Sequence, residues 1–265
     1  MKTKCILQAR ISSSRLWGKI LLPGFDKPLL LHIIERLKKS KLLEDVIVAT
    51  SLKDIDDVVF DICKKNKISV FRGHHTDLLS RYYYCAKKFK IGTIVRITSD
   101  CPLIDFTLVD KVIKFFNKDK EVDYVSNIHP PTYPDGYDIE VISFKALKKS
   151  FSEAKKNFER EHVTPYIWEN PNKFKIKNFQ NPMNKNLYKK YRLTIDYIED
   201  FYVIFKIYQN LYPKKKFFDL KDILKYLNLN PKILVNKKYL GVNWYRHHLS
   251  KLKTVNKKDT KLKYL

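Results

Sequence analysis

Three basic residues lie close together in segment 8–19, directly after the first apolar run of the chain. Arg10, Arg15 and Lys19 are spaced five and four residues apart, with serines and a glycine between them. Their charges would repel one another unless an anion lay among them, and guanidinium and ammonium groups suit the oxygens of a triphosphate. Gly18 would let the backbone come close to such an anion. A solvated basic loop is the alternative, but we favour phosphate binding, because two of these cations are arginines in a chain where lysine is the usual cation.

Aspartates form the second group of candidate residues. Asp100 directly follows the apolar segment 93–97, and Asp105 precedes the apolar-periodic segment 106–117. A carboxylate at the end of a strand could bind Mg²⁺, which takes one or two protein carboxylates together with phosphate oxygens. Because aspartate is also a favoured helix cap, we assign Asp105 to capping and Asp100 to the metal. Asp196 is the candidate second carboxylate, although an aspartate before an amphipathic helix is by itself more often a cap.

Strand and helix patterns alternate along the first half of the chain and would position these residues. Predicted strands cover 5–9, 46–49, 69–71, 93–97 and 123–126, and predicted helices cover 28–39, 54–65, 78–89 and 106–117. This alternation favours an α/β fold with a mainly parallel sheet that helices cover on both faces. Ligands bind such sheets outside the carboxyl ends of the strands, where the loops that carry Arg10 and Asp100 would lie.

The pattern changes after residue 128. A proline-rich loop at 129–136 is followed by a predicted strand at 138–144 and by predicted helices at 158–168 and 200–211. From residue 214 the chain is rich in lysine, and we expect this end to be frayed or packed on the surface.

The composition excludes several classes of protein. With 44% hydrophobic and 14% aromatic residues, the 265-residue chain can build a core, so global disorder is excluded. A net charge of +25, from 53 basic and 28 acidic residues, would suit nucleic acid, but the lysines occur throughout the chain, so we favour a solvated surface. The four widely separated cysteines indicate neither disulfides nor a zinc site. Without a signal-peptide pattern or an apolar run long enough to span a membrane, we expect a soluble cytoplasmic protein with no membrane partner.

Segment 8–19 resembles the signature R-x-x-S-[ST]-R-L-x-G-K of the cytidylyltransferases that make CMP-activated sugar acids. The chain is similar above all to the spore-coat polysaccharide cytidylyltransferase-like branch, which is related to the acylneuraminate and deoxy-octulosonate cytidylyltransferases. The likeness continues in the family's order through 73–82, 96–105, 134–140, 158–166 and 193–197. One departure is Trp17, which stands where relatives usually have proline. We expect its ring to lie beside the phosphates and to shift the loop.

The resemblance implies a three-layer α/β/α, Rossmann-like nucleotide-diphospho-sugar transferase fold with a mainly parallel, mixed sheet. It places a cytidylyltransferase domain at 1–213, with an acceptor-binding and dimerisation part at 128–195, and leaves a lysine-rich extension at 214–265. It also implies CTP and an anionic sugar as substrates, Mg²⁺ as the cofactor and a homodimer as the assembly.

The resemblance extends to residues that would bind the nucleotide, which are Gln8, Arg10, Ser13, Arg15, Lys19, Arg72, Ser80 and Asp100. Arg72 and Ser80 belong to the stretch that approaches the base and ribose in this family, and Gln8 would also face the base. An ordinary arginine after a strand and a serine at a helix start are the structural alternatives. We prefer the nucleotide role.

Asp138, Glu140, Arg160 and His162 belong to the acceptor part that the resemblance implies. Asp138 and Glu140 lie two apart on a predicted strand and point the same way, so they could bind sugar hydroxyls or assist deprotonation. Arg160 or His162 could hold the carboxylate of the acceptor. A salt-bridge network at an interface is an equally good explanation.

The combined hypothesis is a CTP-dependent cytidylyltransferase for surface polysaccharide or glycan biosynthesis. A hydroxyl of an acidic sugar attacks the α-phosphorus of CTP and pyrophosphate leaves. Arg10, Arg15 and Lys19 would stabilise that leaving group, and Asp100 and Asp196 would hold Mg²⁺.

Two rival hypotheses come from other classes. A glycosyltransferase of similar fold would usually need an Asp-x-Asp motif, whereas Ser99-Asp100-Cys101 offers one carboxylate. A nucleic-acid-binding protein would show a basic stripe interleaved with exposed aromatics and a steep salt dependence of binding, and we consider this partner unlikely.

Overall fold

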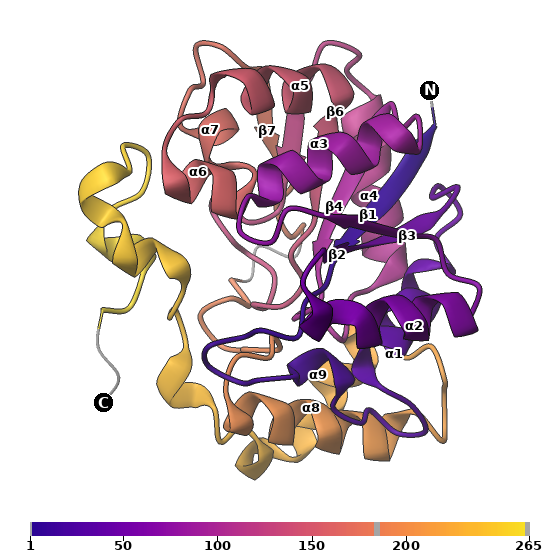
Figure 1. The fold of residues 1–265 in the computed structure, drawn as a ribbon. Coiled ribbons are helices and arrows are strands. Elements are labelled where there is room, and N and C mark those ends of the chain that lie inside the picture. Colours follow the sequence, from indigo (N-terminus) through magenta and orange to yellow (C-terminus); the bar gives the residue numbers. More distant parts are fainter. Residues whose placement is uncertain (1, 183–185, 263–265) are drawn as a thin grey trace.

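A seven-stranded sheet forms the centre of the molecule in the computed structural model, which describes residues 2–182 and 186–262 (Figure 1). Across the sheet the strand order is β3–β2–β1–β4–β6–β5–β7. The strands are β1 (Thr3–Gln8), β2 (Val46–Ser51), β3 (Val70–Gly73), β4 (Thr93–Thr98), β5 (Tyr124–Ser126), β6 (Glu140–Ser143) and β7 (Ile176–Asn178). β6 runs antiparallel to both of its neighbours, whereas the other pairings are parallel, so the sheet is mixed and mainly parallel, as predicted.

Helices cover both faces of this sheet. They are α1 (Leu29–Leu37), α2 (Asp57–Lys65), α3 (Leu78–Lys88), α4 (Phe106–Asn117), α5 (Phe144–Glu153), α6 (Asn157–His162), α7 (Pro165–Trp168), α8 (Ile198–Leu211) and α9 (Leu220–Leu229). Because alternate strand residues face opposite ways, Cys5 and Leu7 pack in the core under α1, α2, α4, α8 and α9, and Ile6 packs under α3, α5, α6 and α7. Figure 1 shows α3, α5, α6 and α7 together on one side of the sheet. The prediction of three layers is confirmed.

The topology creates a crevice beside β1. This strand pairs in parallel with β2 on one side and with β4 on the other. The chain therefore extends the sheet from β1 through β2 to β3 and then reverses to the other side of β1 with β4. Crevices at such reversals, at the carboxyl ends of the strands, are where α/β sheets bind ligands.

Two predicted helices are interrupted in the structure. The helix expected at 54–65 begins with a 3-10 turn at Asp54–Asp56 before α2. The helix expected at 158–168 divides into α6 and α7, because Val163 has a φ of 72° and ends the first helix. Left-handed backbone at a β-branched residue is unfavourable, so tertiary contacts must hold this break. Asp105 caps α4 as predicted, with its Oδ1 accepting from the backbone N–H of Thr107 at 2.8 Å.

The segment after residue 213 packs more closely than its lysine content suggests. Phe218, Ile223 and Leu227 are buried against the core, so the expectation of a surface location is wrong for α9. Further along, Glu169 accepts from the backbone N–H groups of Lys253 and Thr254, which ties the last described segment to the end of α7. The domain division at residue 213 stays a prediction, and the final three residues lie outside the described part.

The predictions for the cysteines and for membrane-spanning segments can also be compared with the structure. The four cysteines are free thiols and are buried, as their apolar neighbours predict. Among the described residues, no helix combines the length and the apolar character that a membrane crossing requires.

Candidate active site

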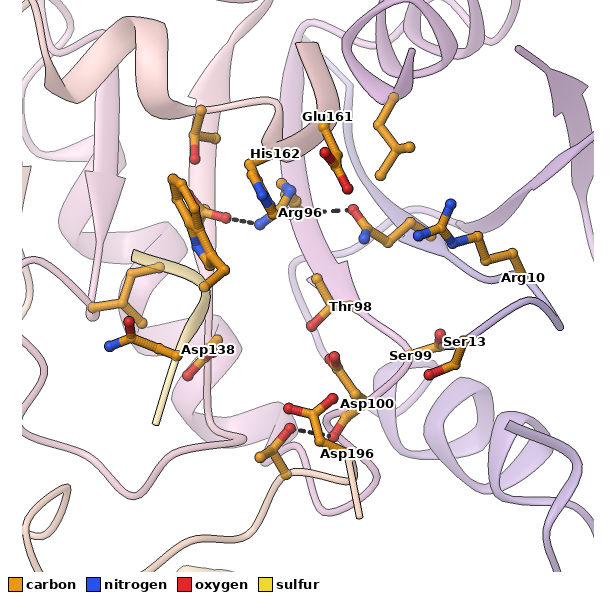
Figure 2. Close-up of a pocket in the computed structure, with 18 of the residues that line it drawn as sticks. Arg10, Ser13, Arg96, Thr98, Ser99, Asp100, Asp138, Glu161, His162 and Asp196 are labelled. Atoms are coloured by element: carbon orange, nitrogen blue, oxygen red, sulfur yellow. Dashed lines mark hydrogen bonds and ion pairs between the residues drawn. The ribbon is translucent and has the colours of Figure 1, made fainter. Parts of the chain in front are cut away.

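A pocket of about 350 Å³ opens at the carboxyl ends of β1 and β4 (Figure 2). One side is lined by the loop after β1 and the start of α3, and the other by residues around β6, α6 and α7 and by segment 242–245. Figure 2 shows Arg10 and Asp138 on opposite sides, with Thr98, Asp100 and Asp196 between them. We call the Arg10 side the nucleotide side and the Asp138 side the acceptor side.

The loop after β1 is held by its own backbone and by one buried carboxylate. Asp56 accepts from the backbone N–H of Ile11 at 2.7 Å and also from the Ser51 hydroxyl. The N–H of Gly18 donates to the carbonyl of Ile11 at 3.0 Å and closes the loop. Gly18 adopts a φ of 66°, a left-handed conformation that glycine reaches without strain. The expectation that the Trp17 ring lies beside the phosphates is wrong, because its side chain is 62% exposed and does not line the pocket, whereas the expected shift of the loop stays a prediction.

The three basic residues of the loop all reach the pocket, but they differ in their partners. Arg10 lines it and makes no ion pair with another described residue. Arg15 donates from Nη2 to Oδ1 of Asp196 at 2.6 Å. Lys19 is nearly buried, and its Nζ lies 2.9 Å from Asp196 Oδ1 and 3.4 Å from Asp100 Oδ2.

The electrostatics of this cluster follow from its burial. Burial alone would lower the pKa of the Lys19 ammonium, but Asp100 and Asp196 outweigh it and raise that pKa above its usual value. Burial would likewise raise the pKa of Asp196, yet Lys19, Arg15 and Arg192 together hold it well below its usual range. The Asp196 carboxylate therefore stays ionised, and the Lys19 ammonium stays charged.

Asp100 and Asp196 together offer a donor set that suits a hard divalent cation. Both line the pocket, and both lie within reach of the Lys19 ammonium. Within the ranges that the structure describes, no group of three or more His, Cys, Asp or Glu side chains gathers as a metal site. Two carboxylates without a third protein ligand fit Mg²⁺, which keeps waters and takes phosphate oxygens, better than zinc.

Asp196 is not a helix cap. The residue before α8 is Tyr197, and Asp200 accepts from the backbone N–H groups of Asp196 and Tyr197, so the capping carboxylate is that of Asp200. This leaves the side chain of Asp196 available to the pocket.

Arg192, which the sequence did not single out, holds Asp196 in place. Its guanidinium is 1% exposed and lies 3.1 Å from Asp196, 2.7 Å from Asp135 and 3.0 Å from Asp200. A backbone hydrogen bond also joins the two segments, since the N–H of Leu193 donates to the carbonyl of Asp135 at 2.7 Å. Arg192 is therefore a positioning residue for this part of the site.

The structure brings together most of the predicted nucleotide residues but not all. Gln8 and Ser13 line the pocket with Arg10, Arg15, Lys19 and Asp100. Arg72 lies outside it and pairs with Asp57, its Nη1 2.6 Å from Oδ1 of that residue. Ser80 also lies outside the lining, and its backbone N–H donates to Asp77 in the first turn of α3. The capping contact favours the structural alternative for Ser80, while both predicted roles stay predictions.

The four predicted acceptor residues also divide. Asp138, Glu140 and His162 line the pocket, whereas Arg160 does not. The guanidinium of Arg160 pairs instead with Asp77, with Nη2 2.7 Å from Oδ2. Glu140 is already paired with Arg96 and accepts from the Tyr124 hydroxyl at 2.5 Å. Burial, with the nearby charges of Asp135 and Asp100, raises the pKa of Asp138 well above its usual value.

Sequence reasoning missed the contribution of the C-terminal segment. Asn243, Trp244 and Tyr245 line the acceptor side, and the ring of Trp244 stacks on that of His162 with centroids 3.8 Å apart. The run Gly-Val-Asn-Trp-Tyr at 241–245 is poor in lysine amid a lysine-rich end, and this contrast is the signal that could have found it.

Comparisons with known proteins agree with this geometry. The cytidylyltransferase family model matches residues 4–229. The chain is 42% identical over 238 residues to the uncharacterized protein MJ1063 of Methanocaldococcus jannaschii, covering 88% of this chain and 93% of that protein. It is 32% identical over 232 residues to the spore coat polysaccharide biosynthesis protein SpsF of Bacillus subtilis, covering 85% of this chain and 94% of that protein.

A solved structure supports the same assignment. The cytidylyltransferase of Leptospira borgpetersenii matches with a TM-score of 0.83 at 40% identity, covering 89% of this chain and 98% of that one. This match confirms the nucleotide-diphospho-sugar transferase fold that the resemblance implies. Because the family model and these relatives span most of its length, the chain belongs to the cytidylyltransferase family.

Proposed function

We propose that this CTP-dependent cytidylyltransferase transfers CMP to a hydroxyl of a sugar-type acceptor, with Asp100 and Asp196 as the centre of the site. The observation that carries the proposal is the meeting of these two carboxylates with Arg15 and Lys19 in one pocket, at the topological reversal beside β1. The resemblance of the chain to enzymes of CMP-activated sugars supports the sugar-type acceptor. The same resemblance implies that this sugar is acidic.

The chain's own residues account for the binding of the triphosphate. Arg10 and Arg15 would bind its oxygens from the loop after β1, and Lys19 would add a buried positive charge beside the carboxylates. Positioning and charge neutralisation carry most of the catalysis in such transfers, because the attacking oxygen and the leaving oxygen stand in line at phosphorus.

Asp138 is the candidate general base. The acceptor hydroxyl would form a bond to the α-phosphorus as the bond to the pyrophosphate oxygen breaks, and its proton must leave. Asp138 lies on the acceptor side of the pocket, where its carboxylate form could accept this proton.

Asp100 and Asp196 would hold Mg²⁺, with phosphate oxygens and water completing its coordination. When bound, the ion withdraws charge from the phosphates and so favours attack at phosphorus. Lys19 and Arg15 keep the Asp196 carboxylate ionised, as a magnesium ligand must be.

The proposal is tested by measuring pyrophosphate release from CTP and the mass of the CMP-bearing product. Asp100→Asn and Asp196→Asn should each lower turnover by about 100-fold or more, because each removes one carboxylate from the proposed metal site. Asp61→Asn, at an exposed position of α2, is the matched control and should be unaffected. Chelation of divalent ions by EDTA should abolish activity.

Two results would contradict the proposal. Turnover of both pocket variants within a few-fold of the control would remove the assigned carboxylates from the reaction. Full activity in EDTA would remove the metal.

A further inference from the structure

Segment 242–245 lines the acceptor side of the pocket, although the cytidylyltransferase family model ends at residue 229. The matched family region therefore does not account for this wall of the pocket. Figure 1 shows this part of the chain, in yellow, next to α6, whose last residue is His162. The role of the segment follows from its own contacts.

A first set of hydrogen bonds fixes the chain before the segment enters the pocket. Asn236 is buried and donates from Nδ2 to the carbonyl of Arg192 at 2.9 Å and to Oδ1 of Asp200 at 2.8 Å. Arg192 in turn donates from Nη1 to the carbonyl of Val242 at 3.2 Å. The same guanidinium holds Asp196, so the network that positions this carboxylate also positions segment 242–245.

A second set of contacts fixes the chain after the segment. The carboxylate of Glu169, at the end of α7, accepts from the backbone N–H of Lys253 at 2.6 Å and from that of Thr254 at 2.9 Å. The neighbouring Leu252 is buried in the same apolar cluster as Tyr245. Because buried contacts hold it on both sides, segment 242–245 is a fixed part of the pocket wall.

Between these two anchors Trp244 lines the pocket with a half-buried ring. The ring stacks on the imidazole of His162, with centroids 3.8 Å apart and 15° between the planes. Tyr245 meets it edge-on at 4.8 Å, and Trp168 lies 6.2 Å away between centroids. All four side chains line the pocket, and we call them the aromatic wall.

An aromatic wall suits the apolar surface of a carbohydrate. The C–H groups of a sugar pack against an aromatic face, while its hydroxyls need polar partners beside that face. Such partners are present, because Asp138 and Thr164 line the same side of the pocket. Pockets of this composition bind the body of a ligand through their rings and orient it through a few polar groups.

The cytosine base of CTP is the other flat surface that could pack on Trp244. Its phosphates are expected at the loop after β1, whereas segment 242–245 lies with β6, α6 and α7 on the opposite side of the pocket. The position of the ring therefore favours the acceptor over the base.

We propose that Trp244 is an acceptor-binding residue that determines specificity, with its ring packed on the C–H surface of the acceptor's carbon skeleton. This inference rests on the proposed function and adds to it a binding subsite beyond the matched family region. It concerns the carbon skeleton of the acceptor and applies equally to an acidic sugar. Its ground is the stack on His162 between two fixed anchors.

The test compares Trp244→Leu with Trp244→Phe in the full chain. The acceptor is supplied as the small-molecule fraction of the cells in which the protein occurs, and pyrophosphate release and the CMP-bearing product are measured with CTP and Mg²⁺. Trp244→Leu keeps an apolar side chain against His162 but loses the ring, so it should raise the half-saturating amount of this fraction about ten-fold. The KM for CTP should stay within about two-fold. Trp244→Phe retains an aromatic face and should raise the half-saturating amount by no more than about three-fold.

Two controls separate binding from folding. Tyr202→Ala removes a ring that is 43% exposed on α8 and outside the pocket lining, so it should change neither kinetic quantity. Calorimetric binding of CTP with Mg²⁺, without acceptor, should give the same Kd for Trp244→Leu as for the unmodified chain, which shows that the pocket of the variant is folded.

The outcomes are distinct. An unchanged half-saturating amount in Trp244→Leu overturns the inference and leaves the proposed function standing. A ten-fold rise in the KM for CTP alone assigns the ring to the cytosine base and also overturns the inference. Equal losses in Trp244→Phe and Trp244→Leu, or weakened CTP binding together with weakened acceptor use, show a packing role and overturn it as well. Absence of release by the unmodified chain contradicts the proposed function itself and removes the basis of the inference with it.

Discussion

Replacing Arg192 by methionine should destabilise the protein strongly. The substitution keeps the apolar volume but removes the cation that Asp135, Asp196 and Asp200 share at 2.7 to 3.1 Å. Removing one partner from a buried ion pair leaves an uncompensated charge and costs about 3–5 kcal/mol. For a domain of this size, a loss of that magnitude lowers Tm by about 6–20 °C.

The control for this variant is the same substitution at a more exposed ion pair. Arg72→Met removes the partner of Asp57, whose side chain is 52% exposed, so it should cost about 1 kcal/mol or less. Urea unfolding at pH 7 measures both variants. A free energy of unfolding for Arg192→Met within about 1 kcal/mol of that for Arg72→Met would refute the argument that the buried charges depend on Arg192.

The loss of stability caused by Arg192→Met should depend on pH in a direction that follows from the pKa shifts. Arg192 lowers the pKa of both Asp135 and Asp196, so its loss must raise both values in the folded state. A group whose pKa is raised on folding binds protons more readily in the native state, which makes the native state relatively more stable as pH falls. The difference between Arg192→Met and the unmodified chain should therefore shrink from pH 7 to pH 5. A difference that grows on acidification would contradict the mechanism.

Two other substitutions test single features of the pocket and its frame. The pKa of His162 is about 3 in the folded protein, whereas an unperturbed histidine has a pKa of about 6.5. Between these two pH values His162 is protonated in the unfolded chain but neutral in the folded one, so the free energy of unfolding rises with pH in this range. His162→Gln should make that slope shallower by up to one proton in urea titrations, and an unchanged slope would show that this imidazole is not protected. Gly136 has a φ of 95°, and a Cβ would lie 2.4 Å from the backbone carbon of Leu193, so Gly136→Ala should cost about 2 kcal/mol or more. Gly18→Ala, with a φ of 66° but open space around it, should cost only about 1 kcal/mol, and equal losses would mean that the close approach to Leu193 is unimportant.

The fold could be predicted largely from the sequence because its signals are local. Buried strands, helical periods and their alternation are each visible within about ten residues, and the parallel sheet follows from their order. The errors have physical reasons. The break at Val163 depends on tertiary contacts that hold a β-branched residue in left-handed backbone. The burial of Phe218 and Ile223 depends on a core that lies far away in sequence, so the lysines around them were misleading.

The site was predictable where its chemistry is local and unpredictable where it depends on pairing. Arg10, Arg15 and Asp100 line the pocket because they follow strands whose carboxyl ends face it, so their placement was predictable, while their roles stay predictions. The contact of Lys19 with Asp100 and Asp196 joins segments more than 80 residues apart and has no local signature. The same holds for Trp244, which reaches the pocket only because the last segment returns to α6 (Figure 1).

Charge is the property that the sequence describes least well. The net charge of +25 does not describe the acceptor side of the pocket, where Glu140 and Asp135 are paired with Arg96 and Arg192. The difference arises because an arginine can bind a charged ligand only if it is not already ion-paired within the protein. Arg96 and Arg160 both form ion pairs with carboxylates of the protein, and these pairs can be identified only from the three-dimensional structure. A motif can therefore predict that an arginine is present near the acceptor, while only its ion pair decides whether it can bind one.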